Sequence, residues 1–234
     1  MFKEVFSRLP LESQYLDALS QDDVAAIVTN IRRERLSAYL EATQSDVEAL
    51  ALYELNARLS NCLHEVIGGL EVVLRNAVSE SIKDHYQRDD WYRARAFTSL
   101  LAPERRQNLR DVRARLKAQR QEERSGRVVA GLTFHFWVAM HENKYRDTIW
   151  TPFLRKLWPD GENIKRVHKD LLKTRDLRNR IAHHEPIFAD RWRRRSETIW
   201  LRLEQLSSSK HAWFEARVKP TLDSLNADLD QLGV

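Results

Sequence analysis

The chain has 234 residues, enough for one domain with a buried core, and only 12 of them are Gly or Pro. With 42% hydrophobic and 31% charged residues, the composition is that of a folded globule and excludes a disordered or collagen-like chain. The single Cys62 excludes an internal disulfide and zinc sites built on Cys pairs. Because neither an export signal nor an apolar run near the ~20 residues of a membrane span is found, we expect a cytoplasmic protein without membrane contact.

The net charge of +5 is unevenly distributed along the chain. Residues 1–90 contain 9 Lys and Arg against 16 Asp and Glu, whereas residues 91–217 contain 29 against 15, a net charge of +14. Arg supplies 29 of the 39 cations, and its planar fork of donors matches phosphate oxygens. This balance favours RNA as a partner, although a run such as residues 105–127 is equally typical of a solvated helix face.

Periodicity predicts an all-α protein, since apolar residues recur at helical spacing and no strand alternation is visible. We expect a single-domain helical bundle over residues 1–234. Its helices are predicted, in chain order, at about 22–42, 46–85, 103–124, 128–140, 160–184, 191–206 and 211–232. The second has an apolar stripe that includes Leu50, Tyr53, Ala57, Leu63, Ile67, Leu70, Leu74 and Val78. The fourth is expected to be buried, and loops around Asn143 and Pro152 are expected to follow it.

One cluster in the predicted helix 191–206 combines Arg with an aromatic ring. It consists of Arg191, Trp192, Arg193, Arg194 and Arg195. Such a cluster is typical of a surface that contacts a nucleic-acid backbone and stacks on a base. The same residues can instead pair with acidic neighbours in their own chain. We treat them as a predicted RNA-binding segment with both alternatives open.

The predicted helix 160–184 contains a cation on its apolar face. On a helical wheel at about 100° per residue, Arg178 lies within the stripe formed by Ile164, Val167, Leu171 and Ala182. A guanidinium stays charged when buried, so the bundle must supply an acceptor. The helix 46–85 offers one in a polar face that consists of His64, Glu71 and Arg75. Either the two helices face each other across a cleft, or an Arg to Glu bridge merely fixes their register.

Asn179 and His183 lie four residues apart and share a ridge of the same helix, with His184 next in sequence. Adjacent histidines point in directions about 100° apart on a helix, and no His-Glu-x-x-His spacing exists. We therefore expect no metal and no other cofactor. Gly-rich phosphate loops and Gly-x-Ser-x-Gly elbows are also missing from the sequence.

The run Arg178-Asn179-Arg180-Ile181-Ala182-His183-His184 resembles the Arg-x4-His motif of the HEPN superfamily, and its double His is similar to Abi-like proteins of bacterial abortive infection. Residues 70–77, LEVVLRNA, and residues 132–138, LTFHFWV, resemble two further blocks of that family. The blocks stand in family order within a core signature region of about residues 46–188. The predicted C-terminal helices, within residues 191–232, follow that region.

This resemblance implies an all-α HEPN domain that acts as a homodimer and cuts RNA without metal. Carried over by position, it makes Arg178, Asn179 and His183 the catalytic residues. Glu71 and Arg75 match the supporting block, and His184 is the alternative catalytic histidine.

The expected chemistry suits these residue types. RNA carries its own nucleophile, the 2′-hydroxyl, so the protein needs a proton-transfer group and charge stabilisation. An imidazole titrates near neutral pH, Arg178 can hold phosphoryl oxygens, and Asn179 can orient His183 or the phosphate. Glu71 would then hold Arg178 in place.

We therefore expect an endoribonuclease toxin of antiviral defence, restrained by an inhibitor of unknown nature. The alternative is a non-catalytic RNA-binding or protein-interaction module on the same helical fold. A purely structural bundle, in which Arg178 is only a buried bridge, leaves Asn179 and His183 unexplained.

Overall fold

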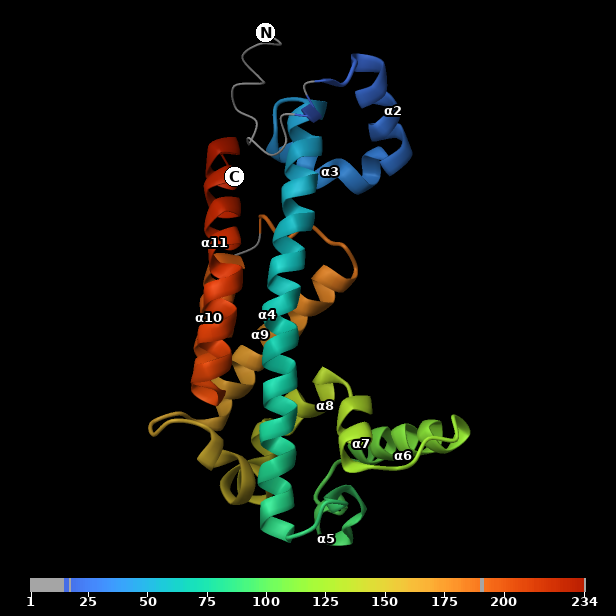
Figure 1. The fold of residues 1–234 in the computed structure, drawn as a ribbon, viewed down its shortest axis with the longest axis vertical. Helices are drawn as coiled ribbons and strands as arrows, with labels where there is room; N and C mark the ends of the chain where they lie inside the picture. The colour runs from blue at the N-terminus through green and yellow to red at the C-terminus, as the bar shows by residue number, and fades with distance from the viewer. Residues whose placement is uncertain (1–14, 17, 190–191, 234) are drawn as a thin grey trace. The chain divides into compact units, whose positions relative to one another are not determined.

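The computed structural model describes residues 15–16, 18–189 and 192–233, and every regular element in these ranges is helical (Figure 1). The all-α prediction is therefore confirmed for this part of the chain. In the same ranges, no helix combines the length and apolar character that crossing a membrane requires.

The described residues divide into two compact units. Unit 1 takes its residues from Met1–Val66, Leu177–Glu197 and Ala212–Val234, and unit 2 takes them from Ile67–Asp176 and Thr198–His211. Four helices contribute residues to both units: α4 (Asp46–Tyr86), α9 (Ile164–Ala182), α10 (Trp192–Leu206) and α11 (Ser208–Leu232).

Two short helices of unit 1 replace one helix that the sequence predicts. α2 (Gln21–Ile31) and α3 (Arg33–Ala42) are separated by Arg32, which adopts a φ of 78°. Ser20 caps α2 in a capping box with Asp23. The prediction of one helix over 22–42 is wrong because the turn at Arg32 redirects the chain, and Leu36 and Tyr39 of α3 are then fully buried.

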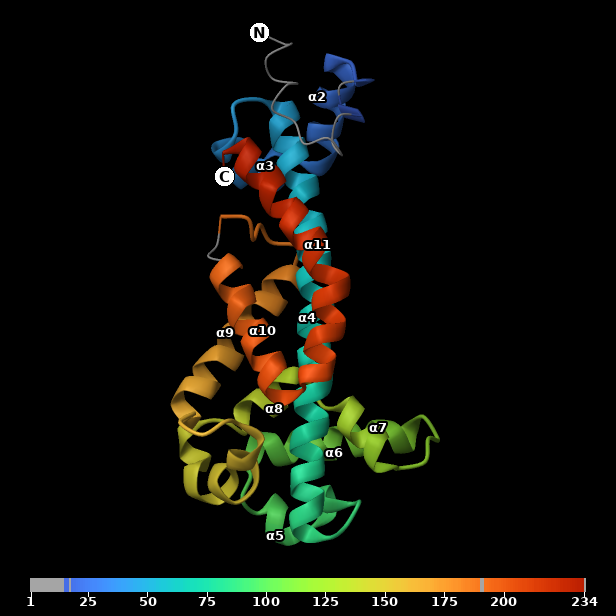
Figure 2. The ribbon, with the colours of Figure 1, turned by 60° about the vertical axis from the view of Figure 1, so that its left-hand side comes forward.

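The first half of α4 supplies more buried hydrophobic residues to unit 1 than any other described element. Its buried line runs through Leu52, Leu55, Leu59 and Leu63 at helical spacing. The expected stripe is wrong at two positions, because Ala57 is exposed and Tyr53 is only half-buried. α11 lies beside this part of α4 in both ribbon views (Figures 1 and 2), where Arg217 forms an ion pair with Glu65.

α11 begins at Ser208, three residues before the predicted start at His211. It buries a stripe that consists of Phe214, Val218, Leu222, Leu225 and Leu229. α10 is described from Trp192 to Leu206, in agreement with the predicted end of that helix.

Unit 2 contains the second half of α4, whose predicted residues Ile67, Leu70, Leu74 and Val78 are all buried. The 3-10 helix η2 (Trp91–Arg93) and α5 (Arg95–Thr98) follow it, and the indole of Trp91 donates a hydrogen bond of 3.0 Å to Ser79. The rings of Trp91, Phe97 and Trp137 form edge-to-face contacts in this core.

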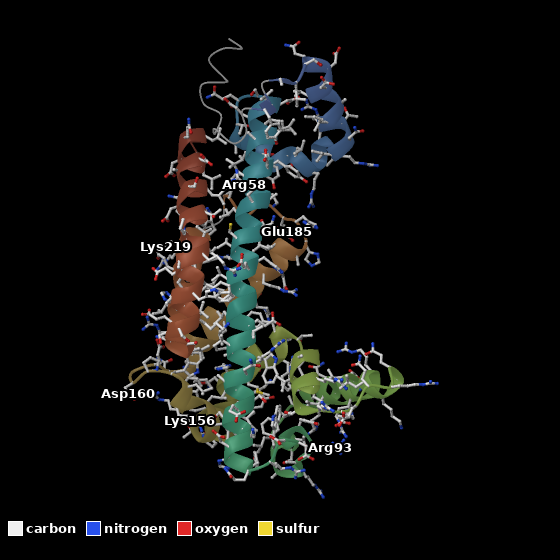
Figure 3. All side chains as sticks on the ribbon, viewed as in Figure 1. Arg58, Arg93, Lys156, Asp160, Glu185 and Lys219 are labelled. Carbon is white, nitrogen blue, oxygen red and sulfur yellow. The ribbon has the colours of Figure 1, made fainter. Side chains whose placement is uncertain are left out.

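α6 (Pro103–Ala118) is shorter than the predicted helix 103–124. It ends because Arg120 takes a φ of 53°, after which the amide of Gln121 donates back to the carbonyl of Leu116. Beyond the end, Glu123 accepts hydrogen bonds from Arg93 (labelled in Figure 3) and Arg113. These contacts stabilise a loop after Ala118, whereas helical periodicity alone predicts that the helix continues to residue 124.

The predicted helix 128–140 is two helices, α7 (Ser125–Gly131) and α8 (Phe134–Ala139). Thr133 interrupts it by accepting a hydrogen bond from the amide of Phe136, as an N-cap does. The expected burial is confirmed, since Val128, Phe136 and Trp137 have no exposed surface.

The segment after α8 is helical where we predict loops. A 3-10 helix η3 (Asn143–Tyr145) leads into the π-helix η4 (Arg146–Leu154), which contains Pro152, and then into the 3-10 helix η5 (Arg155–Leu157). Four apolar side chains of η4 are buried: Ile149, Trp150, Phe153 and Leu154. This burial stabilises a helix that Pro152 alone disfavours.

α9 begins at Ile164, later than the predicted 160. Asn163 provides the N-cap, since its Oδ1 accepts a hydrogen bond of 3.0 Å from the amide of Arg166. Ile164, Val167 and Leu171 are buried as predicted. The buried stripe then continues through Leu177 and Ile181, and Ala182 is exposed, so its predicted core position is wrong.

Candidate functional site at the end of α9

The candidate residues cluster where α9 ends in unit 1. His183 directly follows the last helical residue, and its amide still donates to the carbonyl of Asn179 at 3.0 Å. The amide of His184 donates to Ile181, and that of Glu185 donates to Arg180, both at 2.9 Å. Together these two bonds form a Schellman motif, which satisfies carbonyls that the end of a helix leaves free.

His184 occupies the left-handed position of this motif with a φ of 53°. Glycine is the usual residue there, and a side chain with a Cβ costs about 1 kcal/mol. An imidazole at a strained position is a reason to look for a function of that side chain.

Unit 1 fixes this turn through its backbone. The guanidinium of Arg35, on α3, donates to the carbonyls of His183 at 3.3 Å and His184 at 2.5 Å. Arg180 donates to the carboxylate of Glu185 at 3.2 Å and to the carbonyl of Pro186. Figure 3 labels Glu185 on the turn that follows α9.

Asn56 of α4 fixes the next two residues. Its Oδ1 accepts hydrogen bonds from the amides of Ile187 at 2.7 Å and Phe188 at 3.2 Å. Both of these residues are buried, so their amides need a partner within the protein. The ring of Phe188 also packs on Tyr39, with centroids 5.2 Å apart.

Three polar side chains at this turn have no partner among the described residues of unit 1. Asn179, His183 and His184 are exposed, and in the described residues of unit 1 their side chains make no hydrogen bond or ion pair. A turn held through its backbone thus presents an amide and two imidazoles to solvent. This arrangement is suited to binding and proton transfer.

Arg178 is less buried than the helical wheel indicates. Its side chain is half-buried at the edge of the apolar stripe, and no described residue of unit 1 forms a hydrogen bond or ion pair with it. The expectation of a deeply buried guanidinium is therefore wrong, because Leu177 and Ile181 occupy the centre of the stripe. A partly exposed guanidinium is better placed to meet an anion from solvent.

A cavity of about 300 Å³ lies beside the turn within unit 1. It is lined by Tyr39, Tyr53, Asn56, Ala57, Ser60, Asn61, His64, Ile181, Ala182 and His184. Of the two adjacent histidines, His184 lines this cavity together with His64. Burial raises the pKa of Tyr39 to about 12, so its phenol stays protonated near neutral pH.

Sequence reasoning missed most of this cavity, although a signal exists. Tyr53, Ala57, Ser60 and His64 recur at spacings of three and four and form one face of α4. We assigned Tyr53 and Ala57 to the core, whereas the structure places both at the cavity. Arg35 gave no signal, because its role depends on a contact 148 residues away in sequence.

Glu71 and Arg75 belong to unit 2, so the pairing of Glu71 with Arg178 and the supporting role of Arg75 stay predictions. Both are half-buried, and no hydrogen bond or ion pair joins them to each other. The Nε of Arg75 is buried without a hydrogen-bond partner among the described residues.

In the basic cluster at the start of α10, Arg193 pairs with an acidic residue of its own chain. Trp192 is 4% exposed, and the guanidinium of Arg193 lies over its ring and forms an ion pair with Asp230 at 2.8 Å. Arg194 and Arg195 are not free of interactions either, and Arg191 lies outside the described residues. For Arg193 alone, pairing with an acidic neighbour corresponds to the second of the two alternatives for the cluster.

Among residues 15–16, 18–189 and 192–233, no group of three or more His, Cys, Asp or Glu side chains is placed to hold a metal ion. Comparison of the chain with protein-family models, with curated proteins and with solved structures finds no match in any of the three.

Proposed function

We propose that this protein is a metal-independent endoribonuclease of the HEPN, Abi-like type, acting in the cytoplasm as a toxin of antiphage defence. The observation that carries the proposal is the end of α9, where Arg35 and Asn56 fix the backbone. The side chains of Asn179, His183 and His184 form no hydrogen bond with the described residues of unit 1. These three side chains are exposed, so a ligand can reach them, and a turn that is fixed through its backbone holds them in position for binding.

The charges near the site, and the charge of the chain as a whole, support RNA as the substrate. An open hollow next to the cavity is lined by Ile31, Arg32, Glu34, Arg35 and Tyr53. The exposed Arg32 and the half-buried Arg178 offer guanidinium groups to phosphodiester oxygens. The net charge of +14 over residues 91–217 adds attraction for a polyanion.

The proposed reaction uses the nucleophile of the RNA itself. An imidazole removes the proton of the 2′-hydroxyl, the 2′-oxygen forms a bond to phosphorus, and the bond to the 5′-oxygen breaks. A second proton donor protonates the departing 5′-oxygen, which leaves a 2′,3′-cyclic phosphate and a 5′-hydroxyl. Arg178 stabilises the charge on the phosphoryl oxygens, and Asn179 orients the phosphate or His183.

Two histidines compete for the proton-transfer role. The motif spacing assigns it to His183, whereas His184 lines the cavity with His64. A cavity with two imidazoles can supply both a base and an acid from one chain. Single substitutions of His64, His183 and His184 to Ala distinguish these assignments.

We expect His183→Ala to lower RNA cleavage by about 10²- to 10⁴-fold, the usual effect of losing a general acid or base. Cleavage of single-stranded RNA is measured with EDTA present, and the products are analysed for 2′,3′-cyclic phosphate ends. Arg178→Ala is expected to lose activity as well. Lys173→Ala, which removes an exposed cation from α9, is the matched control and should cut like the parent.

The outcomes separate the hypotheses. If His183→Ala cuts like the parent while His184→Ala and His64→Ala do not, the proton-transfer role belongs to the cavity pair. If the parent protein binds RNA without cutting it, the non-catalytic RNA-binding module is the correct interpretation. Loss of toxicity on induced expression of the inactive variants would link cleavage to defence.

A further inference from the structure

A histidine in unit 2 lies between two guanidinium groups. The Nε2 of His135, on α8, is 2.9 Å from an Nη2 of Arg105, on α6. Its Nδ1 is 3.0 Å from an Nη1 of Arg175, on α9. All three side chains are half-buried, and these elements are labelled in Figure 1.

The three groups cannot all be satisfied by one another. Guanidinium groups only donate hydrogen bonds, and a neutral imidazole has one nitrogen that accepts and one that donates. One of the two Arg–His contacts therefore brings two donors together. Protonation of His135 makes the conflict worse, because neither ring nitrogen can then accept.

The surrounding charges leave this conflict unresolved. Asp176 accepts hydrogen bonds from the Nε and Nη2 of Arg175, and Asn108 accepts one from the Nη1 of Arg105. These acceptors bind the other nitrogens of each guanidinium, so the Nη2 of Arg105 and the Nη1 of Arg175 still face the ring of His135. Glu142 also acts on His135, but it pairs with Lys144 at 2.5 Å.

The pKa of His135 is lowered by burial and then by the charges of Arg105 and Arg175. His168 lowers it further, and Glu142 opposes these effects. The net local potential at the ring is therefore positive.

We propose that Arg105, His135 and Arg175 form a binding site for the phosphoryl group of a phosphate ester. The oxygens of such a group accept from both guanidinium groups and from an imidazole N–H at once, which supplies the acceptors that the cluster lacks. The site stands on contacts within unit 2 alone and does not depend on the ribonuclease proposal.

Calorimetric titration tests the site with two probes at constant ionic strength. Inorganic phosphate represents a terminal or free phosphoryl group, and the dinucleotide UpU represents the diester of a nucleic-acid backbone. We expect at least one probe to bind, and binding to weaken about tenfold or more in Arg105→Gln and in Arg175→Gln, since each loses a charge-assisted bond. Arg110→Gln removes the same charge from another face of α6 and should bind like the parent.

A second measurement guards against loss of folding. If the arginines crowd an empty anion site, Arg105→Gln relieves repulsion, and its thermal midpoint in phosphate-free buffer is equal to or above that of the parent. A lower midpoint together with unchanged binding would make Arg105 a structural partner of His135. No binding of either probe, or equal binding in all variants, overturns the proposal. None of these results bears on cleavage by the site at the end of α9.

Discussion

His141 is completely buried in unit 2, and its protonation couples folding to pH. Its Nδ1 donates to the carbonyl of Trp137 at 3.0 Å, while Nε2 has no partner among the described residues. The rings of Trp150 and Trp158 pack against it edge to face. Burial lowers the pKa of His141 to about 4, because the charged imidazolium would lose its hydration.

Because the unfolded chain binds this proton more readily than the folded chain, acid destabilises the protein. The contribution of His141 to the free energy of unfolding is fully present above pH ~6.5 and is lost as the pH falls toward about 4, at a total of about 3 kcal/mol. Chemical denaturation between pH 7.5 and 4 measures this slope. The lowered pKa values of His135 and His168 act in the same direction.

The variant His141→Phe removes the titrating group and keeps a flat ring in the core. We expect its stability to vary less between pH 6.5 and 4 than that of the parent, whatever its stability at pH 7.5. An unchanged slope would show that the acid sensitivity comes from other groups.

At the scale of single residues, the sequence identifies candidate residues but does not predict their burial or their contacts. The helical wheel singles out Arg178, the four-residue spacing singles out Asn179 and His183, and the resemblance to the Arg-x4-His motif joins the three as a candidate site. The half-burial of Arg178 depends on how Leu177 and Ile181 pack, which no local pattern reports. The contact of Arg35 with the carbonyl of His184 is equally invisible to local reasoning.

At the scale of elements, the end of α9 provides a test of strain. His184 has the left-handed conformation that glycine adopts without cost, so His184→Gly should raise the free energy of unfolding by about 0.5 to 1 kcal/mol. His184→Ala loses the same imidazole but keeps a Cβ, and it should give no such gain. Denaturant midpoints of the two variants and the parent decide this.

If His184 also transfers protons, the stabilised His184→Gly variant loses cleavage activity. A gain in stability with a loss of activity would show that the strain is retained for function. Equal stability of the Gly and Ala variants would contradict the strained turn.

Three predicted helices, over residues 22–42, 103–124 and 128–140, failed for one cause. Periodicity extends a helix through any residue that fits the apolar pattern, and it misses breaks that cost local energy. Arg32 and Arg120 adopt positive φ, and Thr133 caps a new helix. Burial of Leu36 after the break at Arg32, and of Phe136 after the break at Thr133, compensates for the local cost of these two breaks.

At the scale of the whole molecule, we predict a two-fold homodimer with both Arg178 to His183 segments lining one cleft. Attack by the 2′-hydroxyl uses proton removal on one side and proton donation on the other, and symmetry doubles every group. Coexpressed His183→Ala and Arg178→Ala subunits, each inactive alone, should then recover cleavage when purified together through two different tags.

The control is the sedimentation of the parent at the assay concentration. A fully active monomer would contradict the dimer and leave His64 and His184 as the acid and base of one chain.

RNA binding should also weaken steeply with added salt, because the basic part of the chain releases counterions from the phosphates.

By itself the sequence determined the all-α class, the main lines of the core and the candidate residues at the end of α9, because apolar spacing and residue chemistry are local properties. Only the tertiary structure decided the cavity with His64 and His184, the support of the turn by Arg35 and Asn56, and the crowding of His135 by Arg105 and Arg175. Each of these joins residues far apart in the chain, and such contacts follow from how helices pack, which periodicity within one helix does not report.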